Sequence, residues 1–196
     1  MELLNTLMHH AARRGGLHVF GVYYRRLGAA AAAAFSGDLR ARPLGDTELL
    51  AYCADPELEL RESMVRSGNT CIGAFSGGEL AGYAWFAYDD APHVDGVRVR
   101  VPGEAIYRFK TFVRPAWRGR GIAPFLYRAA DELVARRGRG YVVNCIALQN
   151  TASIAASLRS GDAPLGHLGY WQAGRRFIAL RTRGVELFGL RFYLGQ

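Results

Sequence analysis

The chain has 196 residues, which is enough for one domain with a sizeable hydrophobic core. Half of the residues are hydrophobic and 21% are charged, a composition that argues against a disordered or fibrous protein. The formal net charge is +8, and Lys110 is the only lysine among the 25 basic residues.

The first residues predict a helix followed by a strand. Apolar residues recur at helical spacing before Arg13-Arg14 and Gly15-Gly16, which is typical of a short amphipathic helix with a basic C-terminal end. Residues 17–24 are rich in β-branched and aromatic side chains and predict a strand. We expect residues 1–37 to be an N-terminal extension packed on the domain; peripheral membrane contact through the helix is the alternative.

The next segment predicts a strand, two helices and a hairpin. A short strand is expected over residues 38–43, and helices are expected to begin at Asp46 or Thr47 and at Pro56. Residues 70–75 and 79–88 flank Ser76-Gly77-Gly78, a pattern typical of a β-hairpin. Residues 89–96 predict a polar loop.

The last part alternates strands and helices. Residues 105–113 predict a strand, residues 122–134 a helix with one apolar stripe, and residues 141–148 a buried strand. Asn150 is expected to cap a further helix. We expect a loop over residues 161–169 and strands over residues 175–183 and 185–194. Residues 38–196 therefore predict one α/β domain.

A glycine-rich turn, Arg118-Gly119-Arg120-Gly121-Ile122-Ala123, joins the predicted strand to the predicted helix. Glycines let backbone N–H groups approach a ligand, and the helix adds the positive end of its dipole. The two arginines add charge, so the turn predicts a site for a pyrophosphate. The dinucleotide fingerprint is not met, because Pro124 stands at its third glycine position.

This segment resembles the acyl-CoA motif [Q/R]-x-x-G-x-[G/A] of the GNAT superfamily, the Gcn5-related N-acetyltransferases, which Arg118, Gly121 and Ala123 match. The resemblance implies a central mixed, largely antiparallel sheet of about seven strands flanked by helices. It also implies an N-acetyltransferase that moves an acetyl or other acyl group from acyl-CoA to an amine of a small molecule or peptide, by direct transfer and without a metal. The implied cofactor-binding residues are Phe112, Val113, Arg118, Gly119, Arg120, Gly121, Ile122, Ala123 and Asn150.

The catalytic residues depart from the family pattern. Many members place a Tyr seven residues after the Asn as general acid, and this position is Ser157 here. Tyr170, in the Gly-aromatic pair that follows, could substitute for it. The Glu base of many members corresponds to Tyr107, and the nearest glutamate is Glu104.

Two other functions remain open. The basic excess between Arg98 and Arg139 could mark a nucleic-acid-binding module. The departures at Ser157 and Tyr107 could mark an acyl-CoA-binding scaffold without catalysis. The acceptor and the oligomeric state are not readable from the sequence.

The cysteines and the hydropathy bear on the compartment. Cys53, Cys71 and Cys145 are widely spaced and form no CxxC, so neither a disulfide framework nor a zinc site is expected. Cys145, on a predicted buried strand, is expected to be a core residue. No apolar stretch reaches the roughly 18 residues of a membrane span. We therefore expect a cytoplasmic protein.

Overall fold

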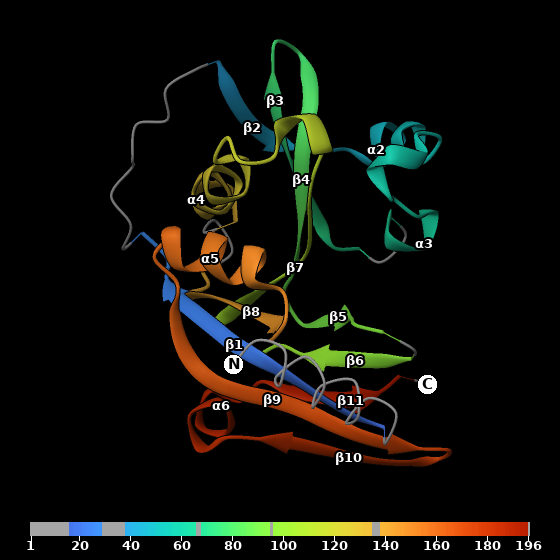
Figure 1. The fold of residues 1–196 in the computed structure, drawn as a ribbon, viewed down its shortest axis with the longest axis vertical. Coiled ribbons are helices and arrows are strands. Elements are labelled where there is room, and N and C mark those ends of the chain that lie inside the picture. Colours follow the sequence, from blue (N-terminus) through green and yellow to red (C-terminus); the bar gives the residue numbers. More distant parts are fainter. Residues whose placement is uncertain (1–15, 29–37, 66–67, 95, 135–137, 196) are drawn as a thin grey trace.

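An eight-stranded sheet runs through the molecule (Figure 1). The computed structural model describes residues 16–28, 38–65, 68–94, 96–134 and 138–195. The strand order is β10-β9-β1-β8-β7-β4-β3-β2, and β7 and β8 form the one parallel pair among the described strands. The strands are β1 (Leu17–Arg26), β2 (Leu39–Pro43), β3 (Thr70–Ser76), β4 (Glu79–Ala87), β7 (Ala105–Val113), β8 (Tyr141–Ala147), β9 (Ala163–Ala173) and β10 (Arg176–Arg181).

Helices cover both faces of the sheet (Figure 1). Helices α4 (Ile122–Val134) and α5 (Thr151–Arg159) lie together on one face, and α2 (Asp46–Tyr52), the 3-10 turn η1 (Pro56–Leu58) and α3 (Glu62–Val65) lie on the other. Strand β4 is buried from Leu80 onward because it is covered on both sides. The predicted mixed, largely antiparallel sheet flanked by helices is thus confirmed, with eight strands instead of about seven.

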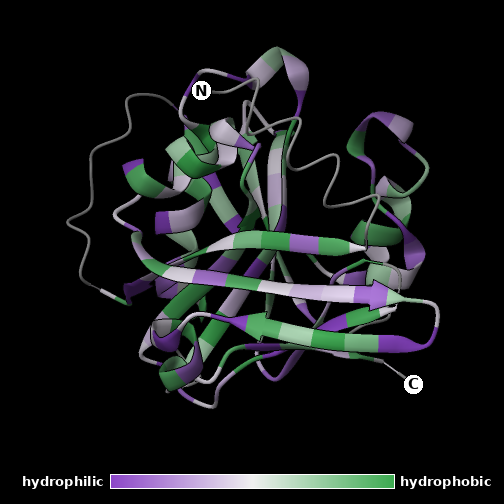
Figure 2. Cartoon of the chain, turned by 60° about the horizontal axis from the view of Figure 1, so that its bottom comes forward, coloured by the Kyte–Doolittle hydropathy of each residue, from purple (hydrophilic) through white to green (hydrophobic). Residues whose placement is uncertain are grey.

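A second, three-stranded sheet packs against the part of the large sheet that contains β9, β1, β8 and β7. It has the order β11-β6-β5, formed by β11 (Arg191–Leu194), β6 (Val97–Arg100) and β5 (Asp90–Pro92). Its residues Ala91, Val99 and Phe192 share one hydrophobic core with Tyr107 and Tyr170 of the large sheet. Hydrophilic and hydrophobic residues alternate along several outer strands (Figure 2), as expected where one face of a strand is covered.

Strand β1 is an inner strand of the large sheet. It pairs antiparallel with β8 on one side and with β9 on the other. The strand predicted for residues 17–24 is therefore confirmed, and it contributes Val22 to the core. The helix predicted before it lies outside the described residues, and the division of the chain at residue 38 stays a prediction.

The predicted hairpin around Gly77 and Gly78 is confirmed. Both glycines have positive φ, 56° and 85°, and join β3 to β4. Such backbone angles are accessible to glycine at little steric cost, which is why the local sequence predicts the turn well.

Three expectations for the chain beyond residue 88 are wrong. Residues 163–173 form strand β9 instead of a loop, because β1 and β10 pair with both of its edges. Residues 183–188 form helix α6 (Arg183–Phe188) instead of a strand, and Gly189 ends it with φ of 88°. The expected loop over residues 89–96 contains β5, which is held by its pairing with β6.

Candidate functional site

The parallel strands β7 and β8 separate part-way along their length. They pair at Ala105↔Tyr141, Ile106↔Val142 and Tyr107↔Val143, whereas β7 continues to Val113 and β8 to Ala147. Beyond Tyr107 and Val143 each strand keeps the neighbour on its other side, β4 or β1. We call this opening the fork. Backbone groups that face it are available to a bound ligand.

A bulge bends β7 on one side of the fork. Its pairing with β4 shifts between Trp85↔Phe109 and Tyr83↔Phe112, so β7 has one more residue than β4 in this stretch. Lys110 lies in the bulge with φ of 44°, and its Nζ donates to Glu59 Oε2 at 2.9 Å. The bulge turns Phe112 toward the α2 and α3 side, where its ring stacks on Tyr83.

The glycine-rich turn lies at the end of β7 and leads directly into α4. Gly119 and Gly121 have φ of 76° and 77°, and no atom lies within 4 Å of where a Cβ on Gly119 would be. Arg118 and Arg120 are exposed: Arg118 Nε donates to Val113 O at 3.2 Å, and the Arg120 guanidinium lies 5.1 Å from the centre of the Trp117 ring. The first turn of a 13-residue helix thus opens onto an exposed, positively charged loop that suits an anion.

A buried charge network occupies the α4 and α5 side of the fork. Arg25 of β1 is ion-paired with Asp131 of α4 and, at 2.7 Å, with Asp162 after α5. Arg108 of β7 donates to the same Asp162 at 2.6 Å, and its guanidinium lies 3.4 Å from the centre of the Tyr127 ring. Burial alone would raise the pKa of Asp162, but the two guanidinium groups outweigh burial and lower it.

Ser157, one of the predicted catalytic residues, belongs to this network. Its hydroxyl oxygen accepts from Arg108 Nη2 at 2.8 Å and from Asn144 Nδ2 at 3.1 Å, and the residue is fully buried. Arg108 Nη1 and Asn144 Oδ1 are buried without a hydrogen-bond partner among the described residues. Both residues directly follow the last paired positions of their strands. Beside the fork, Arg108 Nη1 is therefore a donor, and Asn144 Oδ1 an acceptor, without a partner in the part of the chain that the structure describes.

The other side of the fork is aromatic. Tyr107 is buried, its ring centroid lies 6.1 Å from that of Phe109, and its hydroxyl is hydrogen-bonded with Cys145. Burial raises the pKa of Tyr107 well above its usual value and that of the Cys145 thiol to about 12. Tyr170 is buried in the same core and stacks on His18 with centroids 4.6 Å apart. The Tyr107 hydroxyl and the Cys145 thiol are therefore both protonated at neutral pH.

The remaining predicted site residues lie in different places. Val113 and Ala123 pack against the hydrophobic core between α4 and the large sheet, and Ile122 is buried in that core. Asn150 is exposed and caps α5, accepting from Ser153 N at 3.1 Å. Glu104 lies at the opposite end of β7 from the glycine-rich turn, about 30 Å along a nine-residue strand.

Sequence reasoning missed the buried charges. Arg25, Arg108 and Asp162 look like surface residues in a chain rich in arginine, and Arg25 and Asp162 are 137 positions apart. The available signal was an arginine at position 108, inside a strand whose neighbours are hydrophobic.

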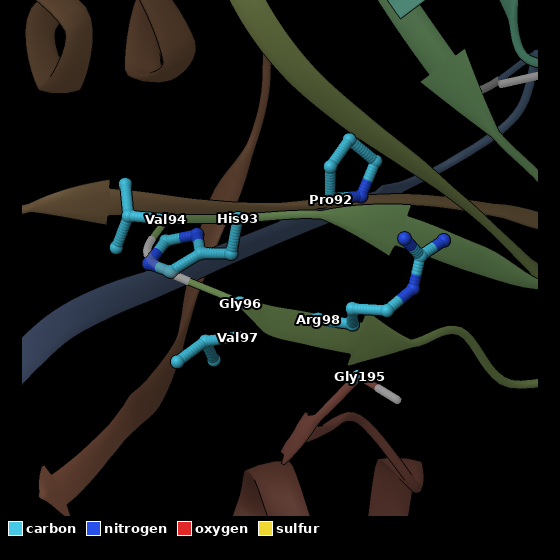
Figure 3. Close-up of a pocket in the computed structure, with 7 residues that line it drawn as sticks. All are labelled: Pro92, His93, Val94, Gly96, Val97, Arg98 and Gly195. Atoms are coloured by element: carbon cyan, nitrogen blue, oxygen red, sulfur yellow. The ribbon is translucent and has the colours of Figure 1, made fainter. Parts of the chain in front are cut away.

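A pocket of about 240 Å³ lies at the hairpin between β5 and β6. Figure 3 shows that Pro92, His93 and Arg98 come from this hairpin, while Gly195 approaches from the end of β11. The His93 ring packs on Phe20 and Phe192, and its Nε2 is buried without a partner among the described residues. Burial, with a smaller effect from His18, lowers the pKa of His93 to about 4, so the imidazole is neutral at neutral pH.

Neither a metal cluster nor a membrane span is found in the described part of the chain. No group of three or more His, Cys, Asp and Glu side chains there could hold a metal ion. Within the same residues, no helix is long and apolar enough to cross a membrane.

Several solved structures share the fold. A GCN5-related N-acetyltransferase from Sphaerobacter thermophilus is 18% identical, with a TM-score of 0.55 over 96% of this chain and 56% of that chain. A GNAT-family acetyltransferase from Colwellia psychrerythraea is 15% identical, with a TM-score of 0.55 over 85% and 57%. A tandem GNAT protein from the clavulanic acid biosynthesis pathway is 21% identical, with a TM-score of 0.55 over 87% and 57%.

These matching structures are longer than this chain. The chain covers 58% and 65% of two further matching structures, so it spans less than two thirds of the length of most of these proteins. No curated protein sequence matches the chain. A family model for the acetyltransferase (GNAT) family matches residues 40–177, which include the fork, the glycine-rich turn and both helices beside it. The chain therefore belongs to the GNAT acetyltransferase family.

Proposed function

We propose that the protein transfers an acetyl or other acyl group from acyl-CoA to an amine, by direct transfer within a ternary complex. One observation carries the proposal: the exposed glycine-rich turn and the first turn of α4 lie at the end of β7, the strand that borders the fork. A pyrophosphate at the turn would leave the rest of a long, thin cofactor to run along the open strand edges.

The turn suits a pyrophosphate because it combines backbone and side-chain charge. Positive φ at Gly119 and Gly121 makes the sharp turn at which backbone N–H groups could face an anion, and the α4 dipole favours an anion at its start. Arg118 and Arg120 could each add a charge-assisted hydrogen bond. The space beside Gly119 is open, so a phosphate can approach the backbone closely.

The fork suits an acyl-pantetheine arm because it offers unpaired polar groups inside a largely apolar region. Backbone groups of β7 and β8 beyond Tyr107 and Val143 can pair with the amides of the arm. Arg108 Nη1 could donate to a carbonyl or to the departing thiolate, where many family members have a tyrosine. A backbone N–H near Phe112 or Val113 remains the candidate donor to the tetrahedral oxyanion.

The proton of the amine needs an acceptor other than Tyr107. Burial keeps its hydroxyl protonated, which favours a packing role for this side chain over a base role. We propose that a water held by backbone carbonyl groups at the fork accepts the proton. Positioning of the two substrates would supply much of the rate, because a thioester is already reactive.

The binding part of the proposal is tested by calorimetry with acetyl-CoA. We expect saturable binding in the wild type, and at least a tenfold higher Kd in the double variant Arg118→Gln/Arg120→Gln, since each lost contact involves a charged group. The matched control is Arg40→Gln/Arg176→Gln, which removes the same charge from exposed positions elsewhere. Absence of binding by every acyl-CoA tested would refute the proposal.

The catalytic part is tested by following free thiol during incubation with acetyl-CoA and a panel of amines. The panel should contain amino acids, amino sugars, polyamines and peptides with free N-termini. Direct transfer predicts intersecting initial-velocity patterns, whereas parallel lines would indicate a covalent acyl-enzyme.

A second candidate is an acyl-CoA-binding protein without transferase activity. The burial of Ser157 and Tyr107 favours it, because neither of these family positions offers a titrating group here. Tight acyl-CoA binding with no release of the CoA thiol in the presence of any amine would support this candidate over the enzyme.

Nucleic-acid binding has weaker support. Many basic side chains of the segment from Arg98 to Arg139 are engaged within the molecule: Arg98 pairs with Asp90, Arg114 with Asp55 and Arg139 with Asp89. These three side chains are therefore not free to extend a basic face from the exposed Arg118 and Arg120. Salt-sensitive retention on RNA or DNA would favour this function.

A further inference from the structure

A second pocket lies at the far end of β7 from the glycine-rich turn. Its volume is about 290 Å³, and four elements build it: β1, β8, β9 and α6, with the turn that precedes β7. The side chains that dominate it are Tyr24, Tyr141 and Phe188. Leu165, Leu187 and Glu104 complete the lining that matters here.

The three aromatic rings are mutual neighbours. The ring centroids of Tyr24 and Tyr141 are 6.4 Å apart, those of Tyr24 and Phe188 6.1 Å, and those of Tyr141 and Phe188 5.9 Å. Their planes are tilted by 40°, 58° and 81°, so the rings face in different directions. One ligand atom above them can lie within the about 6 Å of several centroids that a cation–π interaction requires.

Backbone hydrogen bonds hold the main chain of Glu104 beside these rings. The Glu104 carbonyl accepts from Gly140 N at 2.9 Å and from Tyr141 N at 3.2 Å, which ties the start of β7 to the start of β8. The Glu104 side chain is exposed, and no described residue forms an ion pair with it. Arg26 lies across from Tyr141 in the sheet and Arg183 begins α6, but neither lines the pocket.

The lining selects among ligands by charge and hydration. Ring faces and a carboxylate repel anions and attract cations. A primary ammonium is strongly hydrated and makes three hydrogen bonds. Leu165, Leu187 and Phe188 offer no acceptor from their side chains, so only the Glu104 carboxylate and the two tyrosine hydroxyls of the lining could replace its water. A methylated ammonium carries its charge on apolar methyl groups, so it loses little by leaving water and gains contact with rings and leucines.

We propose that this pocket binds a quaternary or methylated ammonium group, with Tyr24, Tyr141 and Phe188 around the methyl groups and Glu104 as the counter-charge. The site is separate from the proposed acyl-CoA site, because the two lie at opposite ends of β7. It does not depend on the transferase proposal: a protein that fails to bind acyl-CoA could still bind the ammonium group.

The test compares choline with its neutral isostere, 3,3-dimethylbutan-1-ol, by ligand-observed NMR and calorimetry on the full chain. We expect saturable choline binding in the millimolar range and at least fivefold weaker binding of the isostere, since only the charge differs. Equal affinity of the two ligands would overturn the proposal and leave an apolar pocket. Absence of saturable choline binding up to 50 mM, on the order of the weakest affinity of interest, would overturn it as well.

Two variants locate the site. Glu104→Gln keeps the shape and removes the charge, and Phe188→Leu removes one ring while it keeps an apolar side chain. Each variant should weaken choline binding about threefold to tenfold. Glu104→Gln should in addition leave the affinity for the neutral isostere within about twofold of the wild-type value. Glu79→Gln, a change of the same charge at an exposed hairpin position, is the control and should bind choline as the wild type does. Unchanged choline affinity in both site variants, with unchanged thermal unfolding, would place any binding elsewhere and overturn the assignment.

Discussion

The two sides of the fork differ in the way their side chains are held. On the α4 and α5 side, Arg25 and Arg108 share Asp162, and each charge depends on its partners. On the opposite side, Tyr107 and Tyr170 are held by ring contacts and apolar burial. Removal of one partner from a buried ion pair leaves an uncompensated charge, whereas an aromatic core adapts to a conservative change. The first side should therefore be the more sensitive one to substitution.

The largest effect is expected for Asp162→Asn. This change leaves the Arg25 and Arg108 guanidinium groups with incomplete pairing in a buried region, so unfolding should become easier by about 3–5 kcal/mol. Urea denaturation measures the change. Glu186→Gln breaks the exposed pair with Arg181 and should cost under about 1 kcal/mol. If both variants cost the same, the buried network has no special weight.

A change of pH should act next most strongly, through His93. Its pKa is about 4 in the folded chain against 6.5 in its unperturbed form, so between these values the unfolded state binds a proton that the folded state does not. The contribution of neutral His93 to the free energy of unfolding is then fully present above pH 6.5. This contribution falls by roughly 3 kcal/mol as the pH drops to 4, at about 1.4 kcal/mol per pKa unit.

The His93→Gln variant tests the origin of this pH dependence. It should lose most of the slope between pH 6.5 and 4 in denaturation curves. Asp162 should act in a lower window: its lowered pKa gives stability that is present above about 3.8 and is lost below it. A slope that persists in the variant would assign the effect to other groups.

A smaller effect is expected for Ser157→Ala. Arg108 Nη2 and Asn144 Nδ2 lose one shared acceptor but keep Asp162, so the cost should be about 1–2 kcal/mol. If transfer is detected, kcat should stay within about threefold of the wild type. A loss of a hundredfold or more, with normal stability, would instead identify Ser157 as a catalytic residue.

The smallest effect is expected for Tyr107→Phe on the aromatic side. The ring remains and only the hydrogen bond with Cys145 is lost, at a cost of about 1 kcal/mol. The value of kcat should stay within about twofold. A larger loss of kcat than of stability would mean that the hydroxyl takes part in proton transfer.

Features set by nearby residues could be predicted from the sequence. Gly77 and Gly78 determine the hairpin, and Pro115, Gly119 and Gly121 mark the turn before α4 through their own backbone preferences. The family motif lies in this same stretch. The fold class and the position of the proposed cofactor site therefore followed from short-range patterns.

Features set by distant partners could not be predicted. Strand β9 contains Gly166 and Gly169 and looks like a loop, but a Cβ on Gly169 would lie 2.5 Å from His18 O, so the glycine allows β1 to pack closely. The charges of Arg25 and Asp131 give no sign in the sequence that they are buried together, because 106 positions separate them. The sequence shows only that Glu104 lies near Tyr107 along the chain, whereas β1, β8 and α6 form the surroundings of its side chain.

The place of β1 between β8 and β9 has a consequence for synthesis of the protein. This strand leaves the ribosome well before either partner exists, so both of its edges and the side chains of Phe20 and Val22 stay uncovered until most of the chain has been made. Pairing of such distant segments is slow, and open strand edges invite contact with other nascent chains. Yield in cells should therefore depend on chaperone supply and growth temperature more than the stability of the finished fold would indicate.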